Sequence, residues 1–559
     1  MADVFVVSDF NAELVSRYIV ADDKRPVLSV ETANYGQLFQ TLAAERPRSE
    51  TTTLFIWTRP EGISPSFAKL MAGEPVSIEY IFDAVDGFAE TVVGAAGRFR
   101  TVLVATWTRT ENGRGSGLLD WSEHGQARTL AQMNLRLAAR LDGHANIRLL
   151  DSQRWLDVAQ PPRDARYWYA MKFPFTESVA QAAARDVKAA VRAFAGQARK
   201  LVVVDLDDTL WGGVIGETGW QGVRLGGHDP VGEAYVDFQR VLKALAARGI
   251  ALGVVSKNTA AVALEAFDQH PEMMLRRADL AGWRINWRDK AANLADLVKE
   301  LNLGLQSVVF IDNDPTERGR ISEAFPEVLV PDWPSDPTRF ADSLRQIDCF
   351  DQPVLTAEDH SRVKMYTQER ERSASQAAAT SVEEWLNGLG VRVRIEPAGG
   401  TNLVRAVQLA NKTNQLNLRT RRFTEAELMR WLSEGCGRET QTIKVADRFG
   451  DIGLTGLISW EQTDDAVEIV DFVLSCRAMG RQIENLMVHL AVEAAQARGL
   501  ARVVARLIPT PRNEPCREFW KGSRFDEPEM DSFVWDTTNP YPKPAFIAIE
   551  ANTDGAGTQ

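Results

Sequence analysis

Acidic side chains follow an apolar run at a place where a buried strand would end. The run at 200–204 leads into Asp205 and Asp207, with Thr209 two residues further on. Open α/β folds bind ligands at the carboxyl edge of the sheet, so these carboxylates would meet there. They would repel one another unless a hard divalent cation such as Mg²⁺ bound them. One carboxylate could then attack phosphorus, and the one two residues on could act as general acid and base.

Three later segments offer partners for such a site. Ser256 ends another apolar run and can donate its hydroxyl to a phosphoryl oxygen, and Lys290 offers a point positive charge. Asp312 and Asp314 follow a third run and can complete an acidic metal site. Lys257 competes with Lys290 for the phosphate-clamp role. We favour Lys290 because it opens a predicted helix.

The order of nucleophile, hydroxyl, lysine and acidic pair resembles the haloacid dehalogenase (HAD) phosphotransferase superfamily. The segments DLDDTLWGGVIGETG, VVSKN, NWRDKAANL and FIDNDPTER resemble its FkbH-like branch, subfamily IIIC, which primes carrier proteins with glycerate-derived units. The resemblance implies bound Mg²⁺ and a set of site residues. These are Asp205 as phosphate acceptor, Asp207 as acid and base, Thr209, Ser256, Lys257 and Lys290 on phosphate, and Asp205, Asp207 and Asp312 on the metal.

One position departs from that family. Its usual Asp-Asp-Asn is replaced here by Asp312, Asn313 and Asp314, which leaves the roles of the second and third positions open. The glycine-rich stretch 211–219 is expected to form the turn and flap over the site. No insertion large enough for a cap domain follows it, which predicts an open site that admits a bulky or protein-bound substrate.

A thiol lies in a comparable position later in the chain. Cys476 follows the strand pattern AVEIVDFVL and precedes a helix, with Arg477, Gly480 and Arg481 in the turn between them. Backbone N–H groups at a helix start can hold a pyrophosphate or a pantetheine phosphate, and nearby cations lower a thiol pKa. The residues alone leave open that Cys476 is a small buried side chain.

The turn resembles the acyl-CoA-binding turn of the GNAT acyltransferase fold, and PTPRNEPCREFWKGSRF resembles that fold's later helix and strand. The segment SCRAMGR also matches the FkbH-like branch, which implies that Cys476 carries an acyl thioester. A GNAT enzyme that acetylates amines often has a tyrosine where Trp520 stands here. His489, Cys436 and Cys516 are expected to be structural.

Arginines cluster before this turn although the whole chain is acidic. We expect them to form a docking surface for an acidic acyl carrier protein with its phosphopantetheine arm, and Asn414 and Gln415 to hydrogen-bond the arm or the glyceryl hydroxyls. A solvated basic loop is the open alternative. The cluster comprises Arg419, Arg421, Arg422, Arg477 and Arg481.

The first part of the chain resembles an SGNH-hydrolase sheet. Ser8 stands where a nucleophile would follow the first strand, but a working triad also needs a late histidine. Only His124 and His144 precede residue 195. We therefore expect Ser8 to be structural and this domain to be an interaction or scaffold domain.

The fold class predicted is α/β: an SGNH-like parallel sheet, a central HAD Rossmann-like domain without a large cap, and a GNAT-like α+β domain. Apolar runs that alternate with helical patterns favour parallel sheets. Strands are expected at 4–7, 53–58, 101–107, 146–151, 201–205, 250–256, 307–312 and 327–332, then in alternating patterns between 391 and 508. The expected divisions are domains at 1–195, 196–350 and 385–548, a helical linker at 351–384 and a disordered tail at 549–559.

Composition limits the partners. The formal charge is −12, which gives no electrostatic support for a nucleic-acid partner. No apolar run approaches the roughly 18 residues of a membrane span, so no membrane partner is expected. The 4 cysteines are too widely spaced for a disulfide framework or a zinc site. We expect a cytoplasmic protein.

These patterns together predict a dephosphorylating glyceryltransferase. It would take the glyceryl unit of 1,3-bisphosphoglycerate, remove phosphate with Mg²⁺ and load the unit as a thioester on an acyl carrier protein for polyketide or related biosynthesis. The alternatives are a HAD small-molecule phosphatase fused to a CoA-dependent N-acyltransferase, and a noncatalytic docking protein of an assembly line. The order of dephosphorylation and transfer stays open.

Overall fold

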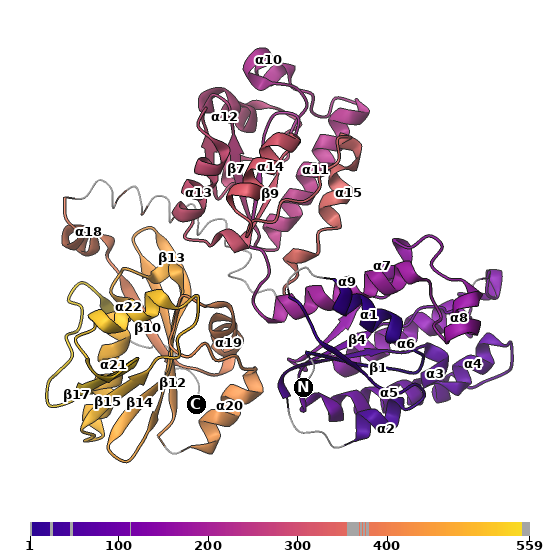
Figure 1. Ribbon diagram of the computed structural model, residues 1–559, viewed down its shortest axis with the longest axis horizontal. Coiled ribbons are helices and arrows are strands. Elements are labelled where there is room, and N and C mark those ends of the chain that lie inside the picture. The colour runs from indigo at the N-terminus through magenta and orange to yellow at the C-terminus, as the bar shows by residue number, and fades with distance from the viewer. Residues whose placement is uncertain are drawn as a thin grey trace, which may run out of the picture. The chain divides into compact units, whose positions relative to one another are not determined.

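The computed structural model describes residues 3–22, 26–44, 49–111, 113–354, 368, 372, 375, 380–435 and 437–550. Most of the expected linker, the tail from 551 onward and Cys436 lie outside these residues. Packing divides the chain into two units, Met1–Phe194 with Asp351–Pro353, and Ala195–Phe350 with Val354–Gln559 (Figure 1). Among the described residues, none of the helices is long and apolar enough to cross a membrane.

The first unit is built on a parallel sheet with the order β2-β1-β3-β4-β5. Its central strands are apolar runs buried on both faces, as the sequence predicts. The edge strand β2 was not predicted because it has only three residues, none of them buried, and no apolar run. The strands are β1 (Val4–Ser8), β2 (Val30–Thr32), β3 (Ser49–Trp57), β4 (Phe99–Ala105) and β5 (Ile147–Leu150).

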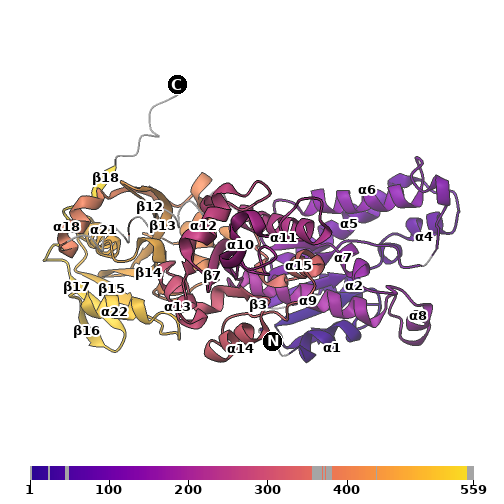
Figure 2. The same ribbon diagram turned by 90° about the horizontal axis from the view of Figure 1, so that it is seen from above.

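Helices cover both faces of this sheet (Figure 2). Side chains alternate along β1, so Val4 and Val6 pack on one set of helices and Phe5 and Val7 on the other. The first set is α1 (Glu13–Ala21), α7 (Gln153–Asp157) and α9 (Glu177–Phe194). The second is α2 (Leu38–Ala43), α4 (Pro65–Met71), α5 (Ile78–Ala96) and α6 (Gln126–Leu141), while α3 (Pro60–Ile63) and α8 (Ala165–Met171) lie in loops after the strands.

The central domain has a parallel sheet of its own, with the order β8-β7-β6-β9. One face packs on α10 (Ile215–Gly222), α11 (Pro230–Ala247), α12 (Ala260–Gln269) and α15 (Phe340–Arg345), and the other on α13 (Lys290–Glu300) and α14 (Pro315–Ala324). The strands are β6 (Leu201–Val204), β7 (Ala251–Ser256), β8 (Gly282–Ile285) and β9 (Val308–Ile311).

Two strand predictions need correction in this domain. The run at 327–332 forms a single bridge, Val309 with Leu329, and no strand. The fourth strand is β8, whose middle residues Trp283 and Arg284 are half-exposed and so break the apolar run. No cap domain interrupts the fully described segment 196–350. Between β6 and α11 there is only the turn and α10, closed by a bridge between Gly212 and Arg224.

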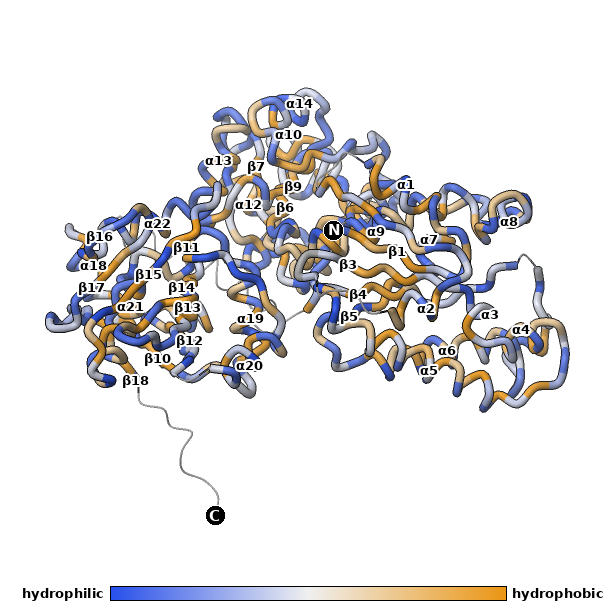
Figure 3. Tube along the Cα trace, turned by 60° about the horizontal axis from the view of Figure 1, so that its bottom comes forward, coloured by the Kyte–Doolittle hydropathy of each residue, from blue (hydrophilic) through white to orange (hydrophobic). Residues whose placement is uncertain are grey.

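The third domain is α+β, as predicted, with one mixed sheet (Figure 3). Its order is β16-β17-β15-β14-β13-β12-β10-β18, with β14 parallel to β15 and β10 parallel to β18. The strands are β10 (Arg392–Pro397), β12 (Glu439–Asp447), β13 (Gly450–Gln462), β14 (Ala466–Leu474), β15 (Arg502–Arg506), β16 (Asp526–Glu529), β17 (Ser532–Asp536) and β18 (Ala548–Glu550), so 549 and 550 are paired and not tail. The helices are α18 (Val382–Leu389), α19 (Leu403–Lys412), α20 (Glu425–Glu434), α21 (Ile483–Ala497) and α22 (Glu514–Gly522).

A short unpredicted strand occupies the fork between two of these strands. The parallel pairing of β14 with β15 ends at Ile469. The rest of β14 pairs instead with β11 (Leu416–Asn417), where Leu416 opposes Leu474. Leu418 continues this segment: its N–H donates to Phe472 at 3.1 Å. The chain itself therefore covers the edge that β14 would otherwise expose.

Candidate functional site

The carboxyl ends of β6 and β9 and the start of α13 meet in the central domain. Lys290 Nζ lies 2.6 Å from Asp312 Oδ2 and 3.1 Å from Asp205 Oδ2. All three side chains are buried. The Asp205 N–H also donates to the Ile311 carbonyl at 3.0 Å, which fixes the two strand ends together. The structure thus brings together three residues that are far apart in sequence.

One oxygen of this cluster is left available. Asp205 Oδ1 is buried and has no hydrogen-bond partner. A buried carboxylate oxygen without a partner is costly unless something outside the chain binds it. It is therefore available to a metal ion or to an incoming phosphorus atom.

Asp207 is held in a different way. Its Oδ1 accepts from the Trp211 indole N–H at 3.0 Å and from the Ile215 N–H at 3.2 Å, and its Oδ2 accepts from Asn258 Nδ2 at 2.9 Å. Burial raises the pKa of Asp207, and the charge of Asp205 adds to this effect against the hydrogen bonds to the carboxylate. A raised pKa suits a carboxyl group that must hold and release a proton.

The buried ammonium and carboxylate also shift each other. Burial alone would lower the pKa of Lys290, but the charges of Asp205 and Asp312 outweigh it and raise that pKa. Burial and the charge of Asp205 raise the pKa of Asp312 to about 6, although Lys290 acts in the opposite direction. Lys290 therefore stays positively charged, as a phosphate clamp requires.

The remaining predicted phosphate ligands lie at the same edge, with one exception. Ser256 ends β7 and is buried. Thr209 is buried and bonds Asn313 in both directions, as donor to Oδ1 and as acceptor from N, each at 3.1 Å. Lys257 is exposed and binds Glu317 Oε1 at 2.6 Å. The geometry thus favours Lys290 over Lys257 as the clamp.

Asp314 does not join the carboxylate cluster. It is exposed, and its Oδ1 accepts from the Thr316 N–H at 2.8 Å as the N-cap of α14. This hydrogen bond is the main cause of its lowered pKa. Asn313, held by Thr209, occupies the middle position. The acidic pair expected here is therefore one buried carboxylate, Asp312, and one helix cap.

The donor set fits a hard divalent cation in part. Asp205 and Asp312 offer buried carboxylate oxygens, and Asp205 Oδ1 is unpartnered. Over the described ranges, no three His, Cys, Asp or Glu side chains are grouped as a metal site. The reason is local: Lys290 lies between the two carboxylates, and both Asp207 oxygens accept from neighbours. Direct ligation by the Asp207 side chain therefore stays a prediction.

Cys476 lies just beyond the end of β14, in a short turn before α21. It is partly exposed, whereas Cys349 and Cys516 are buried. Ser475 begins the turn, and its hydroxyl accepts from Arg477 N at 3.5 Å and from Arg477 Nε at 3.3 Å. The alternative that Cys476 is a sealed core residue is wrong, and the acyl-thioester role stays a prediction.

Two backbone groups of this turn, the Gly480 N–H and the Arg477 carbonyl, are already hydrogen-bonded to side chains of the same segment. The Gly480 N–H donates to Glu484 Oε1 at 2.9 Å, and Glu484 is buried. Arg481 is buried and donates to the Arg477 carbonyl. Burial raises the pKa of Glu484. A phosphate that reached Gly480 would have to displace this carboxylate.

The expectation of an open arginine cluster is wrong in this domain. Arg421 binds Asp471 with two bonds of 2.9 and 2.8 Å, and Arg419 pairs with Glu468. Arg422 donates to the Ala410 and Thr413 carbonyls and to Asn414 Oδ1. These arginines fasten the segment around β11 to the domain, because carboxylates lie opposite Arg419 and Arg421, and oxygens of the backbone and of Asn414 lie opposite Arg422.

Other predicted structural residues behave as expected. His489 Nδ1 lies 2.8 Å from the Tyr541 carbonyl. Trp520 is buried among aromatic rings, including Phe472 at 5.1 Å between centroids. Burial raises the pKa of Cys516 to about 12.

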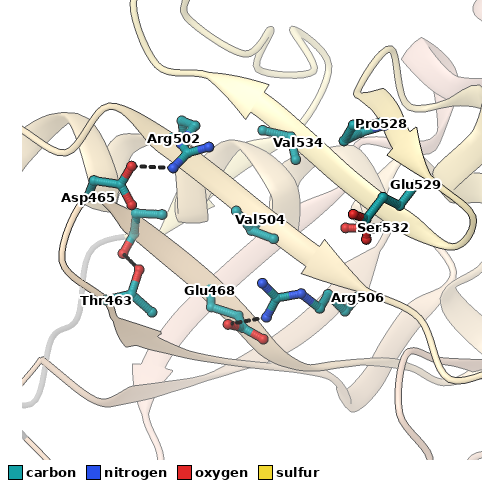
Figure 4. A pocket seen from close by; sticks show the side chains of 11 residues that line it. Thr463, Asp465, Glu468, Arg502, Val504, Arg506, Pro528, Glu529, Ser532 and Val534 are labelled. Atoms are coloured by element: carbon teal, nitrogen blue, oxygen red, sulfur yellow. Dashed lines mark hydrogen bonds and ion pairs between the residues drawn. The ribbon is translucent and has the colours of Figure 1, made fainter.

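A shallow hollow lies on the same sheet but away from Cys476 (Figure 4). It covers the first half of β14 together with β15, β16 and β17. Two ion pairs cross it: Glu468 binds Arg506 at 2.7 Å, and Asp465 binds Arg502. No predicted site residue lines it.

In the first unit Ser8 is buried, and its hydroxyl accepts from the Phe10 N–H at 3.1 Å. The adjacent Asp9 binds Arg59 through N and Nε, each at 2.8 Å. Burial raises the pKa of Asp9. Ser8 thus has a turn-forming contact, consistent with the structural role expected of it.

Comparison with known proteins adds the fold. No protein-family model and no curated protein matches the sequence. The N-terminal part of BF1531 from Bacteroides fragilis, a structure that contains a phosphatase domain complexed with Mg, is similar with a TM-score of 0.57 and 23% identity, over 63% of this chain and 94% of that one. This likeness shows that the chain shares the α/β fold of that structure over the matched part.

Two acetyltransferase structures also match part of the chain. One, from Streptococcus agalactiae, has a TM-score of 0.19 and 14% identity over 25% of this chain and 95% of that one. The ribosomal-protein-S18-alanine N-acetyltransferase from Escherichia coli has a TM-score of 0.19 and 10% identity over 25% and 90%.

Sequence reasoning missed two contacts in the central domain. Asn258 and Trp211 hold the two oxygens of Asp207, and both side chains are buried. Asn258 stands two residues after Ser256, in the segment VVSKN. The sequence therefore places it near the site but does not show that it binds Asp207. Trp211 opens the predicted flap. Both donate to the charged form of the carboxylate and fix its direction.

Proposed function

We propose that this chain is a Mg²⁺-dependent phosphohydrolase joined to an acyl-transfer site, and that it loads the glyceryl unit of 1,3-bisphosphoglycerate as a thioester on an acyl carrier protein for polyketide or related biosynthesis. The observation that carries the phosphoryl half is the cluster in which buried Lys290 contacts both Asp205 and Asp312, with Asp207 held beside it. The glyceryl and carrier parts rest on the FkbH-like resemblance together with the exposure of Cys476.

In the phosphoryl half, Asp205 Oδ1 attacks the phosphate ester. The O–P bond to the glyceryl oxygen breaks as the bond to Asp205 forms, and Asp207 gives its proton to the leaving oxygen. Asp207 then takes a proton from water as the water oxygen bonds to phosphorus and the Asp205–phosphorus bond breaks, which releases inorganic phosphate and restores the Asp205 carboxylate. Lys290 and Ser256 offset the charge of the phosphoryl oxygens.

Mg²⁺ would be held by Asp205 and Asp312. It would supply charge neutralisation between the nucleophile and the phosphate. Two carboxylates beside one ammonium leave a net negative charge, which favours cation binding. Lys290 would keep its contact with Asp312 and orient it.

In the acyl half, the Cys476 thiolate attacks the acyl carbon of 1,3-bisphosphoglycerate. A C–S bond forms, the C–O bond to phosphate breaks, and inorganic phosphate leaves, so no ATP is needed. The pantetheine thiol of the carrier then attacks the thioester, and the proton it loses returns to Cys476. The energy of the acyl phosphate thus passes to the carrier thioester.

The test is incubation of the full chain with holo carrier protein, 1,3-bisphosphoglycerate and Mg²⁺, followed by the mass of the carrier. We expect a glyceryl adduct, a phosphoglyceryl adduct with Asp205→Asn, and none with Cys476→Ala. Lys257→Met is the control, because Lys257 pairs with Glu317 outside the cluster. An undiminished adduct with Cys476→Ala would refute the acyl half, and phosphate release unchanged by Asp205→Asn would refute the phosphoryl half.

The rival N-acyltransferase needs a place for coenzyme A. An extended pantetheine arm could add to an open strand edge through its amides, but β11 covers that edge of β14. Trp520, at the place of a tyrosine proton donor, is buried. The burial of Trp520 favours the carrier-loading proposal, whereas β11 restricts strand-like binding of a coenzyme A arm and of a carrier arm alike.

A further inference from the structure

An exposed aromatic side chain lies close in sequence to Lys290, which belongs to the cluster of Asp205, Lys290 and Asp312. Trp287 is 74% exposed and lies in the loop between β8 and α13, three residues before Lys290. Arg288 follows it with a side chain that is 62% exposed and that binds Asp296 on α13 at 3.1 Å. Tryptophan and arginine are the residue types that contribute most to protein–protein binding energy. Neither side chain has a part in the phosphoryl steps above.

The loop that carries these two residues is fixed at its base. Asn286 and Asn293 bond each other in both directions, at 3.2 and 2.9 Å, and Asn293 is fully buried. The Asn286 N–H donates to the Ser256 carbonyl at 3.1 Å, and Asn286 Oδ1 accepts from the Arg288 N–H at 2.9 Å. The loop is therefore tied to the strand end that carries Ser256.

The far side of the loop is fixed as well. Asp289 caps α13 by accepting from the Ala292 N–H at 3.3 Å and binds Arg320 Nε at 2.5 Å. The rigid base costs little ordering entropy when a partner binds, which is the usual arrangement of a recognition loop.

A second exposed apolar side chain lies near Asp207. Val214 is 43% exposed and precedes Ile215, whose N–H holds Asp207. In the fully described segment 196–350 no cap domain is inserted, because only α10 stands between β6 and α11. A site without a cap can receive a phosphate that is attached to a protein.

We propose that Trp287 and Arg288 form a docking tip for the carrier protein, so that the HAD-like site acts on a phosphoglyceryl group already attached to the carrier. This rests on the proposed function and settles its order: acyl transfer precedes dephosphorylation. The indole packs on an apolar patch of the carrier, and the exposed Arg288 guanidinium exchanges its contact with Asp296 for one with the acidic surface of the carrier. Free small phosphate esters reach Asp205 without touching the tip.

The test compares two substrates with the full chain: p-nitrophenyl phosphate and phosphoglyceryl carrier protein. Trp287→Ala and Arg288→Ala should each lower kcat/KM for the carrier substrate about tenfold or more, mainly through KM, and leave p-nitrophenyl phosphate within about twofold. Trp121→Ala is the matched control, since Trp121 is 69% exposed in the first unit. It should change neither.

The outcomes separate the two proposals. If kcat/KM falls equally for both substrates, the loop shapes the catalytic cluster and does not dock the carrier. If kcat/KM falls for neither substrate, the two side chains do not contact the carrier. Either result overturns the docking role and leaves the carrier-loading function standing. If the wild-type chain releases phosphate from p-nitrophenyl phosphate but not from the carrier substrate, the order of steps is overturned. If Cys476→Ala and the wild type load the carrier equally, the proposed function itself fails.

Discussion

Lys290 Nζ lies within hydrogen-bond distance of Asp312 Oδ2, at 2.6 Å, and it also contacts Asp205. One buried cation thus holds two buried carboxylates from neighbouring strands. We predict that Lys290→Met lowers the free energy of unfolding by about 3 kcal/mol without Mg²⁺, because it leaves buried carboxylates unpaired. Urea unfolding with and without MgCl₂ measures this, and Mg²⁺ should restore more stability to the variant than it adds to the wild type.

Phosphate release should fall by about a hundredfold or more in the same variant. Lys257→Met is the control, since Lys257 binds Glu317 away from the carboxylates, and it should keep its Mg²⁺-free stability within about 1 kcal/mol. Equal stability of Lys290→Met and the wild type without Mg²⁺ would contradict the bridging role.

Cysteine reactivity gives a second prediction. In a Cys436→Ser background, iodoacetamide should modify Cys476 and leave Cys349 and Cys516 intact, because the thiolate reacts and burial raises the pKa of Cys516 to about 12. Peptide mass spectrometry after short labelling measures it. Labelling of Cys516 as fast as Cys476 would show that Cys476 has no special access.

The sequence predicts the strand ends of the phosphoryl cluster because each follows an apolar run. Asp205, Ser256 and Asp312 therefore share one edge in any parallel arrangement. The sequence places Lys290 near this edge as a phosphate ligand, but its pairing with both carboxylates was not predicted. The sequence does not predict which side chain turns toward which, so the role of Asn258 and the diversion of Asp314 to cap α14 were missed.

Long-range pairing limits the prediction in the third domain. A strand of two residues such as β11 has no periodicity to detect, and only its partner β14 defines it. The arginines around it looked like a free basic surface because their acidic partners, Glu468 and Asp471, lie about 50 residues away in sequence. Charge counts along a chain do not show which charges are paired.

A pH dependence follows from Asp9. Burial raises its pKa above the ordinary value of about 3.9, although Arg59 acts in the opposite direction. A raised folded-state pKa adds stability that is complete below about pH 4 and is lost as the pH rises through the folded value. Asn cannot titrate, so the unfolding free energy of the wild type minus that of Asp9→Asn should increase as the pH falls from about 7 to 4.

Urea unfolding of both proteins across that pH range measures the difference. Asp120→Asn in the same unit is the opposite control: the hydrogen bond from Arg109 lowers the pKa of Asp120, so its contribution is lost as the pH falls. A wild-type advantage over Asp9→Asn that shrinks toward low pH would show that the ion pair with Arg59 outweighs burial.

Coenzyme A binding tests what β11 does. Asn513 is buried, and its Nδ2 donates to the Asn417 and Ile508 carbonyls, each at 3.0 Å, which pins β11 in the fork beside β14. We predict no saturable binding of coenzyme A to the wild type up to about 1 mM by calorimetry, because β11 already pairs with the edge. Asn513→Ala should loosen β11, seen as faster amide exchange at Leu418, and should gain measurable binding of coenzyme A.

The matched control is Asn485→Ala, which removes a side chain that accepts a hydrogen bond from Tyr541 elsewhere in the domain. Micromolar binding to the wild type would mean that coenzyme A enters by another route, and the N-acyltransferase alternative would then regain support.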